Sequence, residues 1–147
     1  MILRDARPAE RQDLEELQRR ASLMWDGDRP FLLANPDVIE LPLAHIFEGR
    51  VRVMEDAGKP VGFAVLLERT DAAILEGLFV EPEYGRRGIG RLLVEDASSR
   101  ARAAGLPALE VVANGNALGF YQGLGFAVCG ETQTQFGPAK RLRLPLK

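Results

Sequence analysis

The sequence predicts a fold of the α/β (α+β) class, with a mixed, mostly antiparallel central sheet of six to seven strands and helices on both faces. Three observations lead to this expectation. Strand-like and helix-like apolar periodicities alternate along one chain. Three strand patterns in succession, at 50–56, 60–69 and 71–80, predict an antiparallel meander. A later strand–helix–strand pattern predicts a parallel pair joined by a right-handed crossover.

The composition is that of an ordinary globular protein, and 147 residues favour a single domain spanning 1–147. The net charge of −2 gives no indication of a nucleic-acid or membrane partner. One cysteine, Cys129, and one histidine, His45, argue against an internal disulfide and against a metal site. The charged start of the chain is unlike a signal peptide, and no apolar run approaches the roughly 20 residues that span a bilayer. We therefore expect a cytoplasmic protein.

The N-terminal third combines a clear helix with a segment that is difficult to interpret. Residues 1–6 predict a short strand, and 8–24 predict a helix. The apolar stripe of this helix consists of Leu14, Leu17, Ala21 and Met24. The prolines and broken apolar pairs of 25–49 predict short helices and loops.

The middle of the chain carries the strongest strand patterns. In 50–56 valines alternate with arginines, and a glycine-containing turn follows. In 60–69 both alternating sets of residues are apolar, so both faces of this strand should be covered. The segment 71–80 is also nearly continuous in apolar residues and should be central, although Glu76 interrupts it.

A helix should begin near Ile89 and stop at Gly105, because Pro107 lies just behind. Its apolar side is expected to consist of Ile89, Leu92, Leu93, Ala97, Ala101 and Ala104. Strands are then expected at 107–113, 126–132 and 140–146, with a short helix at 116–125.

Two side-chain predictions concern the last strands. Cys129 should pack within the strand at 126–132. Leu142, Leu144 and Leu146 alternate with charged residues in the last strand. If these leucines are exposed, a homodimer that covers them is possible.

The stretch EYGRRGIGR at 83–91 suggests an anion-binding loop. A nucleoside triphosphate loop needs Gly-Lys-Ser/Thr, which the chain lacks, and a dinucleotide loop needs G-x-G-x-x-G rather than the observed G-x-x-G-x-G. One remaining interpretation is a loop whose N–H groups wrap a pyrophosphate at a helix N-terminus. The other is a tight turn with solvated arginines.

Two motifs, LFVEPEYGRRGIGRLL and LEVVANGNALGFYQGLGF, together resemble the GNAT superfamily of acyl-CoA-dependent N-acetyltransferases. The family pattern is V-x-P, then [Q/R]-x-x-G-x-[G/A], and later N-x-x-A-x-x-F-Y-x-x-x-G-F. The matching residues are Val80, Pro82, Gly88, Gly90, Asn114, Ala117, Phe120, Tyr121, Gly125 and Phe126. The strong match covers 74–128, and the order of elements in the whole chain is compatible with the family.

The resemblance implies acetyl-CoA as co-substrate, and the single cysteine and single histidine already argue against a metal. The pyrophosphate would bind the loop of Arg86, Arg87, Gly88, Ile89, Gly90 and Arg91. The pantetheine arm would pair with Leu78, Phe79 and Val80, which requires that this strand splay from the strand at 107–113. Asn114 would hydrogen-bond the arm. Residues 22–49 and the C-terminal strands would build most of the acceptor site.

The chain departs from the family pattern at two places. Gly85 stands where the family has Gln or Arg, so either Arg86 takes over that role or the loop binds CoA less tightly. Glu110 and Ala108 stand where the family has apolar residues, which indicates a shift of one residue in the strand or its turn.

The acceptor is expected to be a primary amine, which must lose a proton before it can attack a thioester. Glu76 and Glu110 are candidate bases, with His45 as a third. Glu76 could instead be turned to solvent by a bulge or pair with an arginine, and Glu110 could lie on the outer face of the sheet.

Tyr121 is the candidate acid, because the family's tyrosine at this place protonates the departing thiolate. The alternative is a core aromatic, although Phe120 is expected to be the packed ring of the pair. Two other functions also stay open, a non-catalytic acyl-CoA-binding module and a protein or peptide amine acetyltransferase.

Overall fold

The computed structural model describes residues 1–23, 33–34, 39–113, 115–134 and 137–146. Its strands are β1 (Ile2–Asp5), β2 (Val51–Asp56), β3 (Lys59–Glu68), β4 (Ala73–Val80), β5 (Ala108–Ala113), β6 (Ala127–Thr134) and β7 (Gly137–Pro145). Its helices are the 3-10 turns η1 (Pro8–Glu10) and η2 (Pro82–Tyr84) and the α-helices α1 (Arg11–Leu23), α3 (Leu43–Phe47), α4 (Ile89–Ala103) and α5 (Gly115–Gly123). Every strand and helix predicted outside 25–49 is present, with ends that differ by a few residues.

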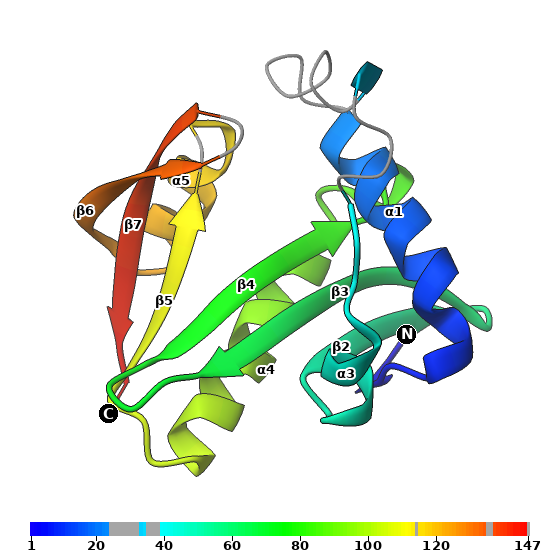
Figure 1. Cartoon of the computed structure of the whole chain (residues 1–147), viewed down its shortest axis with the longest axis horizontal. Helices are drawn as coiled ribbons and strands as arrows, with labels where there is room; N and C mark the ends of the chain where they lie inside the picture. The colour runs from blue at the N-terminus through cyan, green and yellow to red at the C-terminus, as the bar shows by residue number, and fades with distance from the viewer. Residues whose placement is uncertain (24–32, 35–38, 114, 135–136, 147) are drawn as a thin grey trace. The chain divides into compact units, whose positions relative to one another are not determined.

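Within the described ranges, seven strands are hydrogen-bonded in the order β1-β2-β3-β4-β5-β7-β6 (Figure 1). The pairs β1–β2, β2–β3, β5–β7 and β6–β7 are antiparallel, whereas β4 and β5 are parallel. The parallel pair is the one that the strand–helix–strand pattern predicted, because α4 connects its two strands. The predicted class, a mixed and mostly antiparallel sheet, is confirmed.

The ladder between β4 and β5 is short. It runs from the pair Ala73–Leu109 to the pair Leu75–Val111. Because β4 continues to Val80, its second half lies beyond the paired register. This is the arrangement expected of the predicted splayed pair.

The chain divides into two compact units, residues 1–65 with 77–93 and residues 66–76 with 94–147. The boundary passes through β3, β4 and α4, so each of these elements contributes residues to both units. The single domain predicted from the length stays a prediction, and each unit is described by itself.

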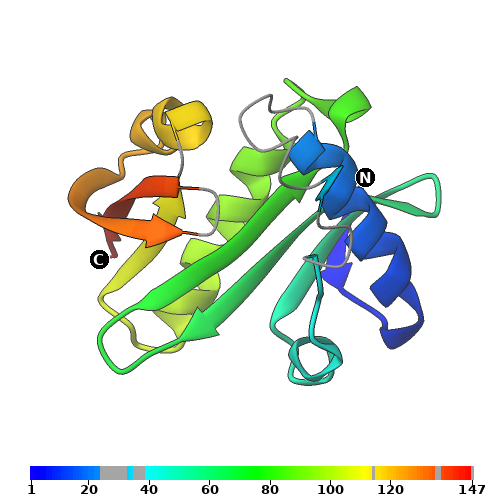
Figure 2. The ribbon, with the colours of Figure 1, turned by 45° about the horizontal axis from the view of Figure 1, so that its top comes forward.

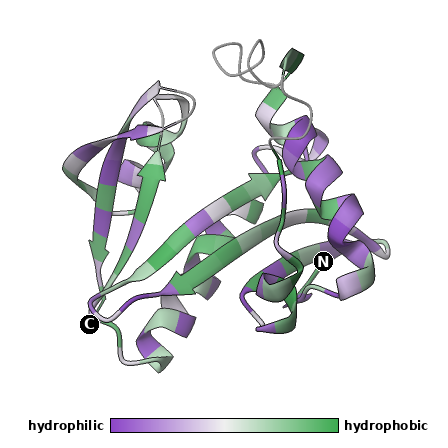
Figure 3. Ribbon diagram, in the orientation of Figure 1, coloured by the Kyte–Doolittle hydropathy of each residue, from purple (hydrophilic) through white to green (hydrophobic). Residues whose placement is uncertain are grey.

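The core of the first unit follows the predicted apolar patterns. Leu14, Leu17 and Ala21 of α1 are buried, as the stripe predicted. In β3 the residues at 61–66 are all buried, so both faces of the strand are covered, and Figure 3 shows its apolar character. Figures 1 and 2 show α1 and the beginning of α4 on opposite sides of β3, which accounts for this burial.

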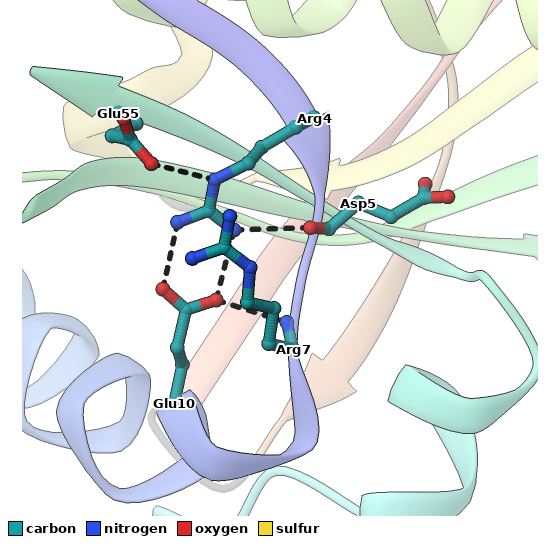
Figure 4. Close-up of polar contacts among 5 residues, drawn as sticks. All are labelled: Arg4, Asp5, Arg7, Glu10 and Glu55. Atoms are coloured by element: carbon teal, nitrogen blue, oxygen red, sulfur yellow. Dashed lines mark hydrogen bonds and ion pairs between the residues drawn. The ribbon is translucent and has the colours of Figure 1, made fainter. Parts of the chain in front are cut away.

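A cluster of charged residues joins β1, η1 and β2 (Figure 4). The Arg4 guanidinium donates to both carboxylate oxygens of Glu10, at 2.9 and 2.7 Å, and its Nε donates to Glu55 at 2.8 Å. The backbone N–H of Arg7 also donates to Glu10 (2.9 Å). These hydrogen bonds, above all those from Arg4, lower the pKa of the Glu10 carboxyl. Complementary hydrogen bonds compensate the partial desolvation of these charges.

The region 25–49 is described in part. Residues 24–32 and 35–38, with Met24 of the predicted stripe, lie outside the described residues. In the rest, Leu41 and Ile46 are buried while Phe47 is 70% exposed. The Nδ1 atom of His45 is buried and has no hydrogen-bond partner among the described residues.

Helix α4 buries a side that differs from the predicted one. Ile89, Leu93, Ala97 and Ala101 are buried as expected, but Leu92 is 43% exposed. The buried side extends instead through Val94 and Ser98, because at 100° per residue Leu92 lies on the opposite flank. Ala104 is also exposed because α4 ends at Ala103, and Gly105 follows with a φ of +77°. The helix therefore ends just before Gly105, as predicted, and Gly105 adopts the left-handed conformation typical of a residue after a helix end.

Two predictions about the last strands are wrong. Cys129 is exposed, because the register of β6 against β7 skips from Val128 to Gly130 and leaves the cysteine in a bulge. Leu142 is fully buried and Leu144 and Leu146 are half-buried. The exposed leucines on which the possible homodimer was based are therefore absent, and a homodimer stays a prediction without that support.

In the described part of the chain, no helix is long and apolar enough to cross a membrane.

Candidate functional site

At the end of β4, packing holds the side chain of Phe79 in place. The Phe79 ring packs against Phe63, with ring centroids 5.3 Å apart. It also covers Gly77, where an added Cβ would lie 2.8 Å from the ring. Leu78 and Val80 are half-buried. Any ligand-binding role of Leu78, Phe79 and Val80 therefore depends mainly on backbone groups.

Glu81 connects β4 to η2 and makes polar contacts in three directions. Its N–H donates to the carbonyl of Val61 in β3 (2.8 Å), and its carbonyl accepts from the N–H of Tyr84 (2.8 Å). Its two carboxylate oxygens accept from Nε and an Nη atom of Arg20 on α1, at 2.7 and 2.8 Å. The chain direction after β4 is thereby fixed from β3, η2 and α1.

Tyr84 supports the loop from one side. Its hydroxyl donates to Asp56 at the end of β2 (2.8 Å), and this hydrogen bond raises the pKa of the Tyr84 phenol. The Arg87 guanidinium lies over the Tyr84 ring, 4.7 Å from its centroid. One of the predicted phosphate-binding arginines is therefore held against an anchored aromatic ring.

The loop backbone turns through two left-handed residues before α4 begins. Arg86 has a φ of +64° and Gly88 a φ of +79°. Gly85, at the position of the departure from the family pattern, has an ordinary φ of −59° and needs no glycine for its conformation. Helix α4 begins at Ile89 as predicted, and the N–H of Leu92 donates to the carbonyl of Gly88 (3.0 Å). Earlier N–H groups of the first turn have no intrahelical acceptor.

The surface of this loop suits an anion. The residues at 85–88 and Arg91 are exposed, whereas Ile89 is buried. Three arginines and the positive end of the α4 dipole therefore belong to the same short, largely exposed segment as the N–H groups of the first turn.

Gly62 in β3 allows α4 to begin close to the sheet. A Cβ at this position would lie 2.9 Å from the Cγ2 atom of Ile89 and 3.2 Å from the carbonyl oxygen of Phe79. The first residue of α4 and the end of β4 can both lie this close to β3 because position 62 has no side chain.

Tyr121 lies in the second unit, on α5, and is 5% exposed. Its ring makes edge contacts with Phe120 and Phe126, at centroid distances of 5.0 and 5.4 Å. Burial raises the pKa of the phenol above its usual value. The expected roles within the pair are reversed, because Phe120 is 40% exposed and Tyr121 is the packed ring. Adjacent residues are about 100° apart on a helix, so only one of the two can face the core.

The two glutamates among the three candidate bases lie in different environments. Both oxygens of Glu110 accept hydrogen bonds from arginines, one from Arg69 at 2.9 Å and the other from Arg143. Glu76 is exposed, and no described residue makes a hydrogen bond or ion pair with its carboxylate. The Glu76 carboxylate therefore has no hydrogen-bonding partner among the described residues, whereas both oxygens of Glu110 are hydrogen-bonded. Asn114, the predicted partner of the pantetheine arm, lies outside the described residues.

The structure brings together some of the predicted residues and adds others. The end of β4 and the loop at 86–91 belong to the first unit, and Glu76, Glu110 and Tyr121 belong to the second. Sequence reasoning missed Arg20 and Glu81, which are far apart in the chain. Glu81 is the variable letter of V-x-P, so the motif itself gave no signal for its role.

Comparison with known proteins identifies the family. Residues 47–128 match the acetyltransferase (GNAT) domain model. Over 130 residues the chain is 31% identical to the peptidyl-lysine N-acetyltransferase YiaC of Escherichia coli, covering 86% of this chain and 84% of YiaC. The chain belongs to the GNAT family of acetyltransferases, as the two motifs predicted.

Other relatives match over shorter segments. The peptidyl-lysine N-acetyltransferase YjaB of Salmonella typhimurium is 39% identical over 53% of this chain and 50% of its own. MJ1207 of Methanocaldococcus jannaschii, an N-acetyltransferase, is 36% identical over 50% of this chain and 37% of its own. The matches thus span half or less of the length of these two relatives.

Solved structures share the fold. A GCN5-related N-acetyltransferase from Rhodopseudomonas palustris superposes with a TM-score of 0.82 at 21% identity, covering 99% of this chain and 95% of that chain. The PaiA N-acetyltransferase of Thermoplasma acidophilum, solved in complex with coenzyme A, gives 0.79 at 17% identity, covering 98% of both chains. These likenesses confirm the GNAT fold.

Proposed function

We propose that this protein is an N-acetyltransferase that moves an acetyl group from acetyl-CoA to a primary amine. The observation that carries this proposal is the loop at 85–91, which leads through a left-handed Gly88 into the N-terminus of α4. A loop of this kind offers backbone donors to a pyrophosphate. It lies within the segment that matches the GNAT family model, and the family's relatives include proteins solved with CoA.

The proposed donor site uses backbone groups more than side chains. The N–H groups at 86–91 would hold the pyrophosphate, with charge added by Arg86, Arg87 and Arg91. The backbone of Leu78, Phe79 and Val80 would pair with the pantetheine arm, because this half of β4 lies beyond its paired register with β5. A backbone N–H near Val80 would polarise the thioester carbonyl. Asn114 would also hydrogen-bond the pantetheine arm.

The proposed chemistry is direct attack of the amine on the thioester. Glu76, acting directly or through water, accepts a proton from the amine, whose nitrogen then forms a bond to the acetyl carbon. The carbon–sulfur bond breaks, the nitrogen loses its second proton to solvent, and the Tyr121 hydroxyl donates a hydrogen bond or its proton to the departing thiolate. We do not assign the base role to Glu110, because both of its oxygens already accept hydrogen bonds from arginines.

Burial of Tyr121 has two opposite consequences for this role. The raised pKa keeps the hydroxyl protonated throughout the neutral range, so the donor is always present. The same shift makes complete proton transfer to a thiolate less favourable. A strong hydrogen bond to the developing negative charge on sulfur is therefore the contribution we expect from Tyr121.

A lysine side chain of a protein is the second candidate acceptor. Its support is the similarity to YiaC, which covers most of both chains, and to YjaB; both are named as peptidyl-lysine N-acetyltransferases. A free small amine remains the other class of acceptor.

The experiment that tests the proposed function has two parts. CoA binding to the purified chain is measured by calorimetry, and CoA release from acetyl-CoA is measured with polyamines, amino acids, aminoglycosides and lysine peptides. Mass spectrometry of the acceptor should show an increase of one acetyl group. Binding without turnover on any amine would instead support a non-catalytic acyl-CoA-binding module.

A further inference from the structure

The Arg20–Glu81 ion pair is formed by residues that neither sequence motif identifies. Its two hydrogen bonds are 2.7 and 2.8 Å long, and the Glu81 side chain is 16% exposed while that of Arg20 is 51% exposed. A forked guanidinium–carboxylate contact of this kind fixes direction as well as distance. The hydrogen bonds that Arg20 donates to Glu81 raise the pKa of Arg20, so the guanidinium remains charged.

Three different groups of Glu81 are hydrogen-bonded to other parts of the chain. Its N–H, its carbonyl and its carboxylate are bonded to Val61, Tyr84 and Arg20 respectively. The first two bonds restrain the backbone from the sheet and from η2. The third restrains it from α1, an element that is 61 residues away in sequence.

The position of Glu81 in the chain gives this restraint its importance. It directly follows Leu78, Phe79 and Val80, which we propose to bind the pantetheine arm. It lies five residues before Arg86, where the proposed pyrophosphate loop starts. A rotation of the backbone at Glu81 would change the direction of one segment relative to the other, and a cofactor that spans both segments requires one fixed direction.

We infer that Arg20 and Glu81 are positioning residues for the acyl-CoA site, and this inference rests on the proposed function. Arg20 holds the Glu81 carboxylate, and Glu81 in turn holds the end of β4 and the start of the loop in the arrangement that binds CoA. Neither residue needs to touch the reacting atoms. Loss of the pair leaves the binding arrangement populated only part of the time, which weakens the apparent affinity in proportion.

The Arg4–Glu10 pair provides a matched control within the same unit. It has the same forked geometry, with hydrogen bonds of 2.9 and 2.7 Å, but joins β1 to η1 rather than to the loop. Both side chains of this pair are about as buried as that of Glu81, at 15% and 14% exposed. Breaking Arg4–Glu10 should therefore affect stability without affecting the cofactor.

The test compares Arg20→Gln, Glu81→Gln, the double variant and Arg20→Lys with wild type and Arg4→Gln. Calorimetry gives the dissociation constant of CoA, steady-state kinetics give KM for acetyl-CoA and kcat, and thermal unfolding shows that each variant is folded. We expect each single variant of the pair to raise the dissociation constant and KM about tenfold, as for an arrangement populated about a tenth of the time. The kcat at saturating acetyl-CoA should change less than about twofold.

The double variant should bind CoA as weakly as either single variant, because the second substitution removes nothing more. Arg20→Lys, which keeps the charge, should lie between Arg20→Gln and wild type. Equal CoA affinities of Arg20→Gln and Arg4→Gln, or additive losses in the double variant, would overturn the inference and leave the proposed function intact. A wild-type chain that does not bind CoA contradicts the proposed function and this inference together.

Discussion

The loop at 85–91 and helix α5 contribute to the proposed function in contrasting ways. The loop is exposed, and its distinctive features are backbone conformations, the left-handed φ values of Arg86 and Gly88. Helix α5 contributes one buried side chain, Tyr121, whose environment changes its acid strength. The loop therefore offers several backbone N–H donors, whereas α5 offers one side-chain hydroxyl group.

This difference separates the expected kinetic effects of substitution. Changes in the loop should alter the affinity for the cofactor, because its backbone donors act on the bound ground state. Changes at Tyr121 should alter kcat, because its hydroxyl acts on a thiolate that exists only as the reaction proceeds. A loop variant that lowers kcat alone, or a Tyr121 variant that weakens CoA binding alone, would contradict this division of roles.

The largest effect is expected for Tyr121→Phe. Removal of the hydroxyl group should lower kcat by about a hundredfold to a thousandfold, the range for loss of one hydrogen-bond donor to a developing negative charge, with CoA affinity unchanged. The buried ring and its contact with Phe126 are retained, so the variant should fold. The control is Phe120→Leu, because Phe120 is exposed. Stopped-flow measurement of CoA release checks both variants, and an equal loss in both would argue for a packing role.

The next effect separates the two strand glutamates. Glu76→Gln should lower kcat about a hundredfold at pH 7 because it removes the proposed base. In Glu110→Gln, kcat should stay close to the wild-type value, while the arginines at positions 69 and 143 lose a charged partner and the melting temperature falls. A pH–rate profile and thermal unfolding of both variants provide the measurements. A large loss of kcat in Glu110→Gln alone would reverse the assignment.

A smaller effect on affinity is expected for Gly88→Ala, with Gly105→Ala as its control. The two glycines flank α4, have φ values of +79° and +77°, and leave open space where a Cβ would be placed. Each substitution should therefore cost a similar 1–2 kcal/mol of backbone strain. Calorimetry should show about tenfold weaker CoA binding for Gly88→Ala only. Equal CoA affinities of the two variants would mean that the loop conformation is unrelated to the cofactor.

The smallest effect on activity is expected for Arg4→Gln, which should lower the free energy of unfolding by about 2 kcal/mol at pH 7. The pKa of Glu10 is lowered in the folded protein, chiefly by Arg4. Its contribution is therefore present above the unfolded pKa of about 4.3 and is lost as the pH falls through the lower folded value. Urea unfolding between pH 7 and pH 3 should show the wild type and the variant converging.

Lys140→Gln serves as the control for that measurement. Lys140 also pairs with a glutamate, Glu131, but both side chains are well exposed, at 42% and 67%. Solvent screens such a pair, so its loss should have a smaller effect than the loss of Arg4. A larger loss of stability in Lys140→Gln would contradict this ranking.

Local patterns were sufficient to predict the order of the elements. The alternation in β2, the two apolar faces of β3 and the glycine that ends α4 each depend on residues near one another in sequence. Motif spacing likewise placed the start of α4 at Ile89 and identified the family.

Contacts between distant residues were not predictable in the same way. The charge on Glu110 suggested a base, and its two arginines, at 69 and 143, come from other elements. The bulge that exposes Cys129 depends on how β6 pairs with β7. The reversal of Phe120 and Tyr121 shows a related limit, because the motif names both rings but does not say which one faces the core.

The missing side chain at position 62 has a consequence for the evolution of this family. An added methyl group there would collide with the Cγ2 atom of Ile89, so the two positions share one small volume. Close relatives with alanine at the position of Gly62 should therefore have a residue smaller than isoleucine at the position of Ile89. The pair should covary, although the two residues are 27 positions apart in the chain.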